Sequence, residues 1–570
     1  MPKNFNAWPD HWPKTLNYPE QPAYSFLDIT AARLPNRLSI IFGGMELTFG
    51  ELKNLADRFA NALIALGLKK GEKVAIHLPN CPQFAIAYYG VLKAGATFTP
   101  LSPLLAPQEV QYQLNDSEAK ILISLDLIYP AIASVISKTQ VDEVISTSIA
   151  DCYNPIIQPL KPLEKTPVPD TIDMAELLKK HSAEVPDIDI DVFSDLAHLS
   201  YTGGTTGRSK GVMLTHYNVV ANVVQFSHWF NGAQIEIIDG VPTAVFPPGV
   251  DPLRDRPVAR DQETALVVVP WFHAMGTIGY LNNMVYGGTT MIVFPRFEPQ
   301  EYLEGVRKYN ATMLGGAPQL YIPLVNLPDF GSYDLSNIKL ATSGAAPLAL
   351  PVLEKMLEAF SGVVCEAYGL TECTMGATAN PPDRAKIRVG SVGVPVFNTE
   401  CKIVDLETDE DLPPNHEGEI CIKGPQLMKG YWNKPEETAD VLKGEWLYTG
   451  DIGKEDADGY FYITDRKKDM IIYKGYNVYP REIEEVIFKH AAVEQCAVVG
   501  QTDMNVGEFP VAFVQLRQGT DLTAEELMTH TNSQIAAYKK IRKVIFLDAL
   551  PVSLAGKVLK RELREMLRNG

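Results

Sequence analysis

Apolar and polar positions alternate with two different periods along the first 300 residues. From Leu52 to Leu63, apolar residues recur three or four positions apart, which predicts an amphipathic helix. Thr48 and Glu51 have the spacing of a capping box at its start, and Gly67 is a natural stop. Short apolar strands that alternate with such helices indicate parallel sheets covered on both faces, so we expect an α/β body. Three further predicted elements are a strand at 73–78, a helix at 82–93 and a strand at 96–99.

The last hundred residues have a different pattern. Strands and short helices follow one another there, and Thr523 with Glu526 forms a second capping box. A segment of about 105 residues is large enough to fold separately as an α+β unit. We therefore expect a large domain at 1–465 and a small one at 466–570. Its predicted elements are helices at 481–489, from 523 onward and after Lys557, and strands at 495–499, 511–516 and 541–547.

Two proline-rich segments interrupt the pattern of the large domain. Residues 154–186 contain six prolines, and we expect an exposed connection there. Residues 231–263 contain five prolines. A stretch of that kind inside a compact domain is either functional or mobile.

The charge of the chain excludes one class of partner. Among 570 residues, 51 are Lys or Arg and 69 are Asp or Glu, a net charge of −18, which argues against a general nucleic-acid-binding protein. The charge is uneven, because residues 466–570 hold 16 basic and 13 acidic residues, a net of +3, and the remainder carries −21. A small basic domain beside an acidic body remains compatible with small polyanionic ligands.

Neither the cysteines nor the apolar runs point to a secreted or membrane-spanning protein. The seven cysteines include no Cys-x-x-Cys pair, so neither a zinc cluster nor a disulfide framework is indicated. The first residues lack the apolar core of a signal peptide, and no apolar run reaches the roughly 18 residues of a membrane span. We expect a cytoplasmic protein without a transmembrane segment.

The densest chemical motif lies between Thr202 and Gly211. It holds four glycines, three threonines, a serine and Lys210, and such a loop can direct backbone N–H groups, hydroxyls and a positive charge at phosphate oxygens. No Walker A register fits, which disfavours a generic P-loop NTPase. An ordinary glycine-rich turn is the alternative explanation.

Three weaker motifs follow. Thr371 and Glu372 offer a hydroxyl and a carboxylate, the oxygen ligands that Mg²⁺ prefers. Asp451 could accept both hydroxyls of a ribose, with Arg466 as an added donor. Lys557 follows a glycine near the C-terminus. Taken singly, each also has an ordinary explanation as a helix start, a turn or a solvated lysine.

Taken together, the order and spacing of these motifs resemble the adenylate-forming superfamily of acyl-CoA synthetases, luciferases and peptide-synthetase adenylation domains. The resemblance runs from about Thr30 to Arg564, and the run through 473–484 is most similar to the fatty-acyl and aryl-CoA ligase branch. It implies an α/β fold with parallel-sheet subdomains, a small barrel-like part and a small mobile α+β C-terminal domain. Matching segments are 343–348, 368–372, 448–451, 465–466, 473–477 and Lys557.

The resemblance also implies a reaction in two steps and a set of ligands. A carboxylic acid, expected to be a medium- or long-chain fatty acid, reacts with Mg²⁺-bound ATP to give acyl-AMP and pyrophosphate. Coenzyme A then displaces AMP to give a thioester. Glu372 would hold Mg²⁺, Thr371 would touch the α-phosphate, and Lys557 would stabilise the first transition state. The other implied ATP contacts are Thr202, Gly203, Gly204, Thr205, Thr206, Gly207 and Lys210 at the phosphates, Tyr368, Gly369, Gly344, Ala345 and Ala346 at the adenine, and Asp451 and Arg466 at the ribose.

The acyl and thiol sites follow from the same resemblance. His273 would lie beside the acyl group, with a buried structural histidine as the alternative. Lys468 would be the hinge at which the small domain turns between the two steps. The residues implied at the acyl pocket are Trp271, Gly276, Thr277, Leu314, Gly315 and Gly316, and those implied on the CoA side are Lys474, Gly475 and Tyr476.

The chain departs from the family pattern at the phosphate loop. Gly203 stands where a serine is common, and Arg208-Ser209 stands where a proline commonly precedes the lysine. Arg208 could compensate as an extra cation. The 231–263 segment, longer than usual, could cover the acyl entrance or form an oligomer contact.

Several alternatives stay open from the sequence alone. The acid could be aromatic or of another kind, and the acceptor could be a carrier protein. A non-catalytic binding protein on the same scaffold is disfavoured, because Glu372, Asp451, Arg466 and Lys557 are all present. A homodimer and peripheral contact with a membrane are further possibilities.

Overall fold

A computed structural model describes residues 6–9, 11–152, 164–202, 209–238, 241–246, 257–344, 348, 350–474, 476–503, 506–552 and 558–569. The chain divides into two compact units. The first comprises residues 1–202, 209–400 and 423–447, and the second includes 401–422 and 448–570. The expected domain boundary between 465 and 466 stays a prediction.

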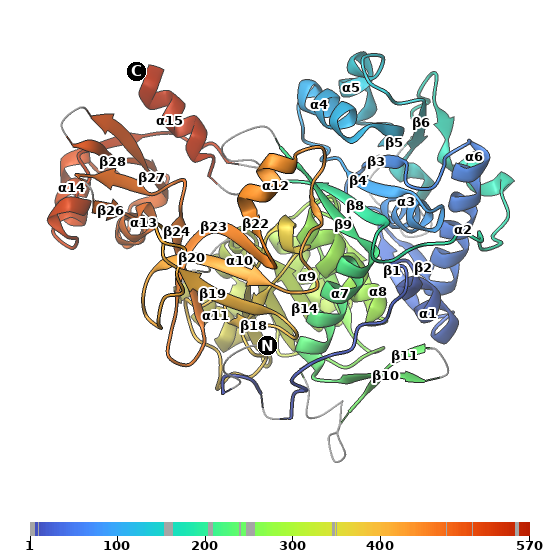
Figure 1. Cartoon of the computed structure of the whole chain (residues 1–570), viewed down its shortest axis with the longest axis horizontal. Helices are drawn as coiled ribbons and strands as arrows, with labels where there is room; N and C mark the ends of the chain where they lie inside the picture. Colours follow the sequence, from blue (N-terminus) through green and yellow to red (C-terminus); the bar gives the residue numbers. More distant parts are fainter. Residues whose placement is uncertain are drawn as a thin grey trace. The chain divides into compact units, whose positions relative to one another are not determined.

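The first sheet of the first unit has the predicted alternation of strands and helices (Figure 1). The Thr48 side chain accepts from Glu51 N and caps α2 (Phe49–Ala65), while the Glu51 carboxylate accepts from Thr48 N. α3 (Pro82–Lys93) has the predicted bounds and packs against α2, β3 and β4. The strand order is β21 (Gly430–Tyr431), β9 (Gly211–Thr215), β8 (Leu196–Tyr201), β4 (Thr97–Pro100), β3 (Lys73–His77), β5 (Ala119–Leu125), β6 (Glu143–Thr147) and β7 (Ile172–Asp173).

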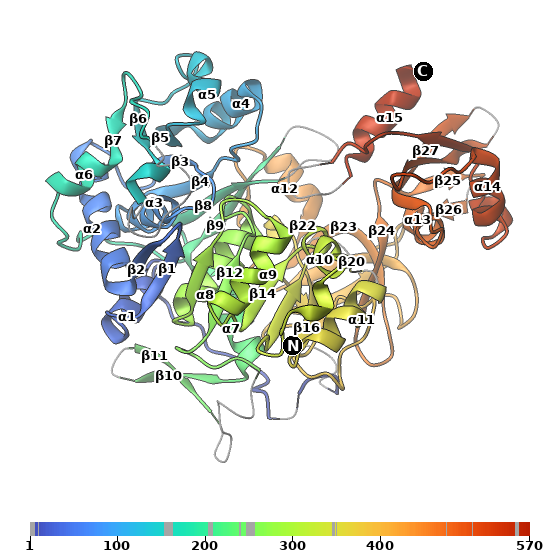
Figure 2. The same cartoon turned by 180° about the vertical axis from the view of Figure 1, so that it is seen from behind.

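A second sheet of the same unit carries a run of parallel strands, β16 to β13. α9, α10 and α11 cover one of its faces (Figure 2). Its strand order is β18 (Val394–Pro395), β17 (Thr378–Ala379), β16 (Val363–Tyr368), β15 (Leu340–Ser343), β14 (Met313–Gly316), β12 (Thr264–Val267), β13 (Thr290–Val293), β1 (Leu38–Phe42) and β2 (Met45–Thr48). Helices of the unit are α1 (Ser25–Arg33), α4 (Pro107–Ser117), α5 (Tyr129–Ile136), α6 (Met174–Lys180), α7 (His216–Asn231), α8 (Asn283–Tyr286), α9 (Pro299–Lys308), α10 (Pro318–Val325), α11 (Leu350–Ala359) and α12 (Pro435–Val441).

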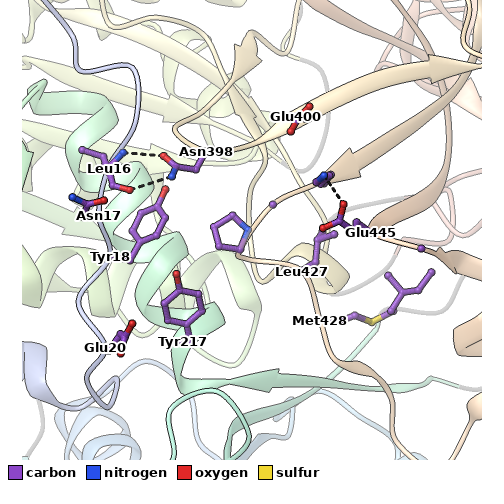
Figure 3. A pocket seen from close by; sticks show the side chains of 15 residues that line it. Leu16, Asn17, Tyr18, Glu20, Tyr217, Asn398, Glu400, Leu427, Met428 and Glu445 are labelled. Atoms are coloured by element: carbon purple, nitrogen blue, oxygen red, sulfur yellow. Dashed lines mark hydrogen bonds and ion pairs between the residues drawn. The ribbon is translucent and has the colours of Figure 1, made fainter. Parts of the chain in front are cut away.

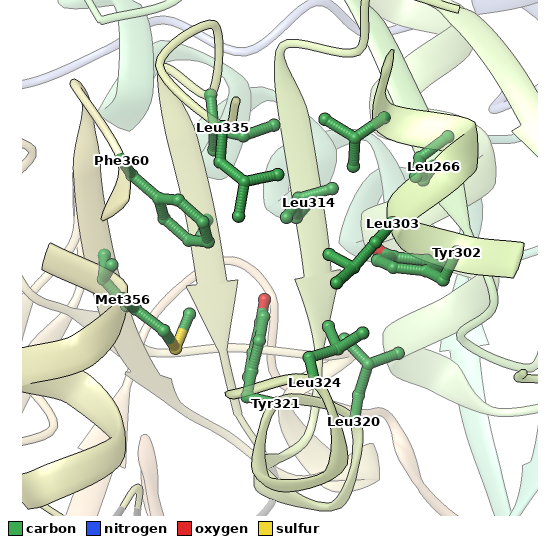
Figure 4. Packing of buried hydrophobic residues seen from close by; sticks show 14 of the residues in the cluster. Leu266, Tyr302, Leu303, Leu314, Leu320, Tyr321, Leu324, Leu335, Met356 and Phe360 are labelled. Carbon is green, nitrogen blue, oxygen red and sulfur yellow. The ribbon is translucent and has the colours of Figure 1, made fainter. Parts of the chain in front are cut away.

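An apolar core lies between this sheet and its helices (Figure 4). Leu314 of β14 is 2% exposed and packs with Tyr302 and Leu303 of α9 and Tyr321 of α10. Burial of such side chains contributes roughly 1.5–3 kcal/mol each to folding. The core therefore holds the three neighbouring strands β14, β15 and β16 in a fixed register.

The second unit contains two sheets. One holds β19 (Glu400–Val404), β20 (Gly418–Lys423), β23 (Trp446–Glu455) and β24 (Phe461–Arg466). β22 (Leu442–Lys443) pairs with Trp446 and Leu447, the first two residues of β23, and these four residues belong to the first unit. The other sheet holds β26 (Tyr476–Val478), β25 (Ile471–Tyr473), β28 (Gly507–Leu516), β27 (Val493–Asp503) and β29 (Lys543–Phe546). α13 (Pro480–Phe488), α14 (Ala524–Asn532) and α15 (Lys560–Asn569) complete the α+β pattern predicted for the last hundred residues.

The two proline-rich segments contain more regular structure than their composition predicts. The described part of 154–186 is mostly exposed or half-buried, as expected, but it also contains a helix, α6, in which Met174 and Leu177 are buried. Asp173 caps this helix, and the prolines flank it without entering it. Within 231–263, β10 (Gln234–Ile238) and β11 (Val241–Val245) form an antiparallel ribbon. Pro242 is tolerated because a strand without a second neighbour does not need every N–H as a donor.

Among the described residues, no helix has both the length and the apolar character needed to cross a bilayer.

Candidate functional site

The carboxyl ends of three parallel strands bring several predicted site residues to one edge of the second sheet. β14, β15 and β16 are neighbours in register, with Gly316 opposite Ser343 and Ser343 opposite Glu366. Gly344 follows β15 directly, and its N–H donates to Gly316 O at 3.1 Å. The carboxyl edge of a parallel sheet is the usual place for a ligand in an open α/β fold.

Gly369 is held in a close backbone approach, whereas Gly344 has ordinary packing contacts around it. A Cβ at Gly369 would lie 2.0 Å from the carbonyl oxygen of Met375, so only glycine fits there. A Cβ at Gly344 would be 3.5 Å from Met275 Cε, which places the predicted adenine region next to the predicted acyl region. Tyr368, the last residue of β16, is 8% exposed. Ala345 and Ala346 lie outside the described residues.

The predicted acyl residues gather around a π-helical segment, Met275–Asn282. A π-helical turn inside a helix frequently marks a functional site. Gly276 permits it, because a Cβ there would lie 1.8 Å from Pro270 O. Trp271 is fully buried, and its indole N–H donates to Tyr280 O at 3.1 Å. It therefore packs inside this region and exposes no surface. Thr277 is also buried, whereas the side chain of His273 is exposed, which disfavours the alternative of a buried structural histidine.

We expect replacement of Gly315 by alanine to disturb this region. A Cβ at residue 315 would lie 1.7 Å from the hydroxyl of Tyr280, which bonds to Thr342 Oγ1. Overpacking of this kind costs roughly 1–3 kcal/mol and displaces Tyr280. Steady-state kinetics should show a raised KM for the carboxylic acid with little change in the KM for ATP. Gly331→Ala, where the Cβ meets open space, is the matched control, and equal behaviour of both variants would contradict the assignment.

The two ends of the glycine-rich loop are closed by hydrogen bonds. Thr202 N donates to Lys210 O at 3.0 Å, and Lys210 N donates to Thr202 Oγ1 at 3.3 Å. Ser209 precedes Lys210, and its hydroxyl bonds to Thr202 O. The predicted phosphate-binding residues Gly203, Gly204, Thr205, Thr206 and Gly207, together with Arg208, lie outside the described residues.

Helix α4 supports both ends of the loop, which the sequence did not suggest. The Tyr112 hydroxyl donates to Ser209 O at 2.9 Å, and the Tyr201 hydroxyl donates to Asp116 Oδ2 at 2.7 Å. Burial and the Asp116 carboxylate raise the pKa of Tyr201, so this phenol stays protonated and remains a donor. The loop is therefore anchored at residues 201 and 209 by one helix.

Lys210 and Glu372 meet through Tyr431. The Tyr431 hydroxyl donates to Glu372 Oε1 at 2.7 Å, and the Lys210 ammonium lies over the Tyr431 ring, 4.3 Å from its centroid. Met428 N donates to Glu372 O at 2.9 Å. Two predicted site residues that are far apart in sequence thus share one aromatic side chain. Tyr431 was not singled out from the sequence, and no local spacing marks it.

The carboxylate oxygens of Glu372 suit a magnesium ion that also binds phosphate. Oε1 accepts from Tyr431, while Oε2 accepts no hydrogen bond from the described residues. In the described part of the chain, no group of three His, Cys, Asp or Glu side chains could cage a metal. Mg²⁺ commonly uses one or two carboxylates plus substrate phosphates and water, so a single carboxylate that Tyr431 links to Lys210 fits it.

The second unit holds the predicted ribose-binding pair on adjacent strands. Asp451 of β23 and Arg466 of β24 are opposite each other, and Arg466 Nε lies 3.0 Å from Asp451 Oδ1. The Asp451 side chain is 7% exposed. Glu419 supports the turn beside it, accepting from Gly450 N at 2.9 Å and pairing with Lys467 at 2.9 Å. The carboxylate is thus held at a fixed position beside an arginine.

The predicted hinge, Lys468, is next in sequence to a partly buried group of charged side chains of the second unit. Lys468 is exposed, and the next residue, Asp469, pairs with Arg564 of α15 at 2.7 Å. Burial raises the pKa of Asp465 to about 6. Lys560 pairs with Glu484 at 2.9 Å; burial lowers its pKa, but Glu484 and Asp465 together raise it overall.

The CoA-side residues are only partly described. Lys474 has a left-handed backbone, φ 51°, and its N–H donates to Val506 O at 2.7 Å. Tyr476 begins β26. Gly475 and Lys557 lie outside the described residues, so their assigned roles stay predictions.

A polar cavity of about 740 Å³ lies on the first unit next to the segment that carries Met428 (Figure 3). Tyr18 and Tyr217 line it together with Asn398, whose amide bonds both backbone polar groups of Leu16. None of the residues expected from the sequence to bind ATP or the acid lines this cavity.

Two family models of known proteins match this chain, one over its large N-terminal part and one near its C-terminus. The family model described as AMP-binding enzyme matches residues 27–432, and the one described as AMP-binding enzyme C-terminal domain matches 482–557. A long-chain-fatty-acid–CoA ligase of Bacillus subtilis (strain 168) is 39% identical over 98% of this chain and 97% of that protein.

Solved structures give the same result. An anthranilate CoA ligase in complex with anthranoyl-AMP has a TM-score of 0.83 at 25% identity, covering 98% of each chain. The O-succinylbenzoate coenzyme A synthetase of Bacillus subtilis in complex with ATP and magnesium ion has a TM-score of 0.75 at 28% identity, covering 96% of this chain and 99% of that one.

Proposed function

Because the chain belongs to the family of AMP-binding enzymes, we propose that it is an ATP-dependent acyl-CoA ligase for medium- or long-chain fatty acids. It would convert the acid and ATP to acyl-AMP and pyrophosphate, and then acyl-AMP and coenzyme A to acyl-CoA and AMP. The observation that carries the proposal is the junction of Lys210, Tyr431 and Glu372 at the end of the glycine-rich loop. The Lys210 ammonium, which can bind phosphate, and the Glu372 carboxylate, which can bind a metal ion, contact the same tyrosine there.

The residues divide the first step among them. Lys210 and Thr202, with the loop 203–207, bind the β- and γ-phosphates, and Thr371 contacts the α-phosphate. Glu372 holds Mg²⁺, whose contribution is to neutralise charge on phosphate oxygens. Lys557 adds a fixed positive charge where negative charge develops on the α-phosphate during attack by the carboxylate. Since that charge is larger in the transition state than in bound ATP, Lys557 acts mainly on the rate of adenylation.

Recognition of the remaining parts of the substrates follows from the other groups. Asp451 accepts from the ribose hydroxyls and Arg466 donates, while Tyr368 stacks on adenine. Gly344, Ala345, Ala346 and Gly369 contribute to the same pocket. Trp271, Gly276, Thr277, Gly315 and Gly316 border the acyl chain, and His273 lies at its carboxylate end. In the second step, residues 466–570 turn about Lys468, withdraw Lys557 and present Lys474, Gly475 and Tyr476 to the thiol.

An aromatic acid is the second candidate substrate. It is supported by the likeness to the anthranilate CoA ligase, which covers nearly the whole chain. A carrier protein as acceptor has less support, because the Bacillus subtilis relative, which matches over 97% of its length, is named as a CoA ligase. A cytoplasmic location, a homodimer and peripheral membrane contact stay proposals.

The test is release of pyrophosphate and AMP across acids from acetate to palmitate, benzoate and cinnamates, with and without coenzyme A. We expect CoA-dependent AMP release that is fastest with medium- or long-chain acids. Fastest turnover with benzoate or cinnamates would favour the aromatic candidate. Pyrophosphate release that coenzyme A does not turn into thioester would point to another acceptor. A thermal shift with ATP but no pyrophosphate release with any acid would overturn the enzymatic assignment.

A further inference from the structure

Tyr431 lies at a junction of three segments that contribute to the phosphate region. It belongs to β21, which pairs antiparallel with β9, so that Tyr431 is opposite Val212 and Gly430 is opposite Met213. Trp432 N donates to Gly211 O at 2.8 Å. This register fixes Tyr431 opposite the second residue after Lys210, at the exit of the glycine-rich loop.

The same strand segment fixes Glu372 twice. Met428 N holds the Glu372 carbonyl at 2.9 Å, and the Tyr431 hydroxyl holds Oε1 at 2.7 Å. An ionised carboxylate only accepts hydrogen bonds, so the phenol is the donor in this contact. The rotamer of Glu372 is thereby set, with Oε2 left for a metal ion.

The ring of Tyr431 contacts the second charged group of this junction, the Lys210 ammonium. Lys210 is half-buried, and its ammonium lies 4.3 Å from the ring centroid. In the described part of the chain, no carboxylate lies within ion-pair distance of this ammonium. An aromatic face attracts a cation without neutralising it, so the full charge of Lys210 stays available to a phosphate.

We propose that Tyr431 is a positioning residue that aims the Glu372 carboxylate at Mg²⁺ with its hydroxyl and the Lys210 ammonium at the polyphosphate with its ring. This inference rests on the proposed function, because it assumes that metal-bound ATP is the ligand. Hydroxyl and ring act on different partners, so removing them separately has different consequences.

Two substitutions separate the two roles. Tyr431→Phe removes only the hydrogen bond to Glu372, and Tyr431→Leu removes the ring as well. Loss of an outer-shell partner typically weakens metal affinity about 10-fold or more. Loss of a cation–π contact is expected to weaken nucleotide binding about 3- to 10-fold, since tenfold corresponds to about 1.4 kcal/mol.

The measurement is equilibrium binding in the absence of any acid, so that no turnover occurs. Binding of Mn²⁺ to the ATP complex is followed by electron paramagnetic resonance, and binding of ATP without metal by calorimetry. We expect Tyr431→Phe to weaken Mn²⁺ binding about 10-fold with metal-free ATP binding unchanged. Tyr431→Leu should weaken both. In ATP–pyrophosphate exchange, added Mg²⁺ should restore the rate of Tyr431→Phe but not fully that of Tyr431→Leu.

Two controls keep the result interpretable. Tyr462→Phe removes a tyrosine–carboxylate hydrogen bond of the same kind, 3.1 Å to Asp456, in the second unit, and should bind Mn²⁺ and ATP as the parent chain does. In a Glu372→Gln background, Tyr431→Phe should have no further effect on Mn²⁺ binding, because the carboxylate that would bind the metal is gone. A further loss of Mn²⁺ binding in this background would show that Tyr431 has a structural role, and it would overturn the inference. This test does not use Tyr431→Leu, so it is valid even if that variant fails to fold.

The inference and the proposed function fail in distinguishable ways. If the parent chain exchanges pyrophosphate and Tyr431→Phe binds Mn²⁺ as tightly as the parent, the role of Tyr431 is overturned while the function stands. If no acid supports exchange but Tyr431→Phe still weakens Mn²⁺ binding to the ATP complex, the positioning role stands and the ligase assignment is overturned.

Discussion

Replacement of Lys557 by alanine is expected to abolish adenylation and to spare thioester formation. ATP–pyrophosphate exchange should fall by about 100- to 1000-fold, the usual loss when one preorganised charge or donor is removed from a transition state. Transfer from supplied acyl-AMP to coenzyme A should stay within a few-fold of the parent rate, because in the proposed mechanism Lys557 is withdrawn in that step. Lys557→Arg should recover part of the exchange, since it keeps the charge but not the geometry.

The comparison needs a control close in sequence. Arg561→Ala removes a basic residue at the start of α15 whose side chain is 51% exposed and pairs only at 3.6 Å with Glu565. It should leave both half-reactions unchanged, since exposed pairs of this kind contribute little. Equal loss of both half-reactions in Lys557→Ala would contradict the assigned role and would also argue against a turn of residues 466–570 about Lys468.

Asp451→Asn should impair recognition of the ribose. The side chain is nearly buried and accepts from Arg466 at 3.0 Å, so the substitution removes a charged acceptor and weakens the contact with Arg466. Hydrogen bonds to charged groups contribute about 1.5–3 kcal/mol, which corresponds to a rise of roughly 10- to 100-fold in the KM for ATP. Adenylation kinetics at saturating acid measure this directly.

A nucleotide analogue makes the assignment more specific. The parent chain should prefer ATP to 2′,3′-dideoxy-ATP, and Asp451→Asn should lose most of this preference because the hydroxyls no longer meet a carboxylate. Asp458→Asn, an exposed position in the turn between β23 and β24, is the matched control and should keep it. If Asp451→Asn discriminated between the two nucleotides as well as the parent, Asp451 would not contact the ribose.

Local sequence patterns account for much of the fold. Both capping boxes form as predicted, at Thr48 and at Thr523, and α3 begins and ends at the predicted residues. These features depend on residues within a few positions of each other, so the chain specifies them without tertiary contacts. Three strands of the last hundred residues lie where they were predicted, although β27 and β28 are longer than expected. The short strands β25 and β26 were not predicted.

Composition was a poorer guide where prolines are frequent. The β10–β11 ribbon and helix α6 were not predicted, because the proline content of a whole segment does not show which positions in it can form regular structure. The position of each proline matters instead: at a strand edge or outside a helix it costs no hydrogen bond.

The sequence by itself determined the chemical inventory of this protein: a glycine-rich loop with a lysine, a Thr-Glu pair, an aspartate and arginine pair, and an alternating α/β body with a small α+β unit. Only the tertiary structure decided which of these groups meet. Lys210 and Tyr431 are 221 positions apart, and Tyr431 and Glu372 are 59 apart, yet strand pairing between β9 and β21 joins them. Strand register is a cooperative result of long-range backbone hydrogen bonds and core packing, so no local spacing along the chain records it.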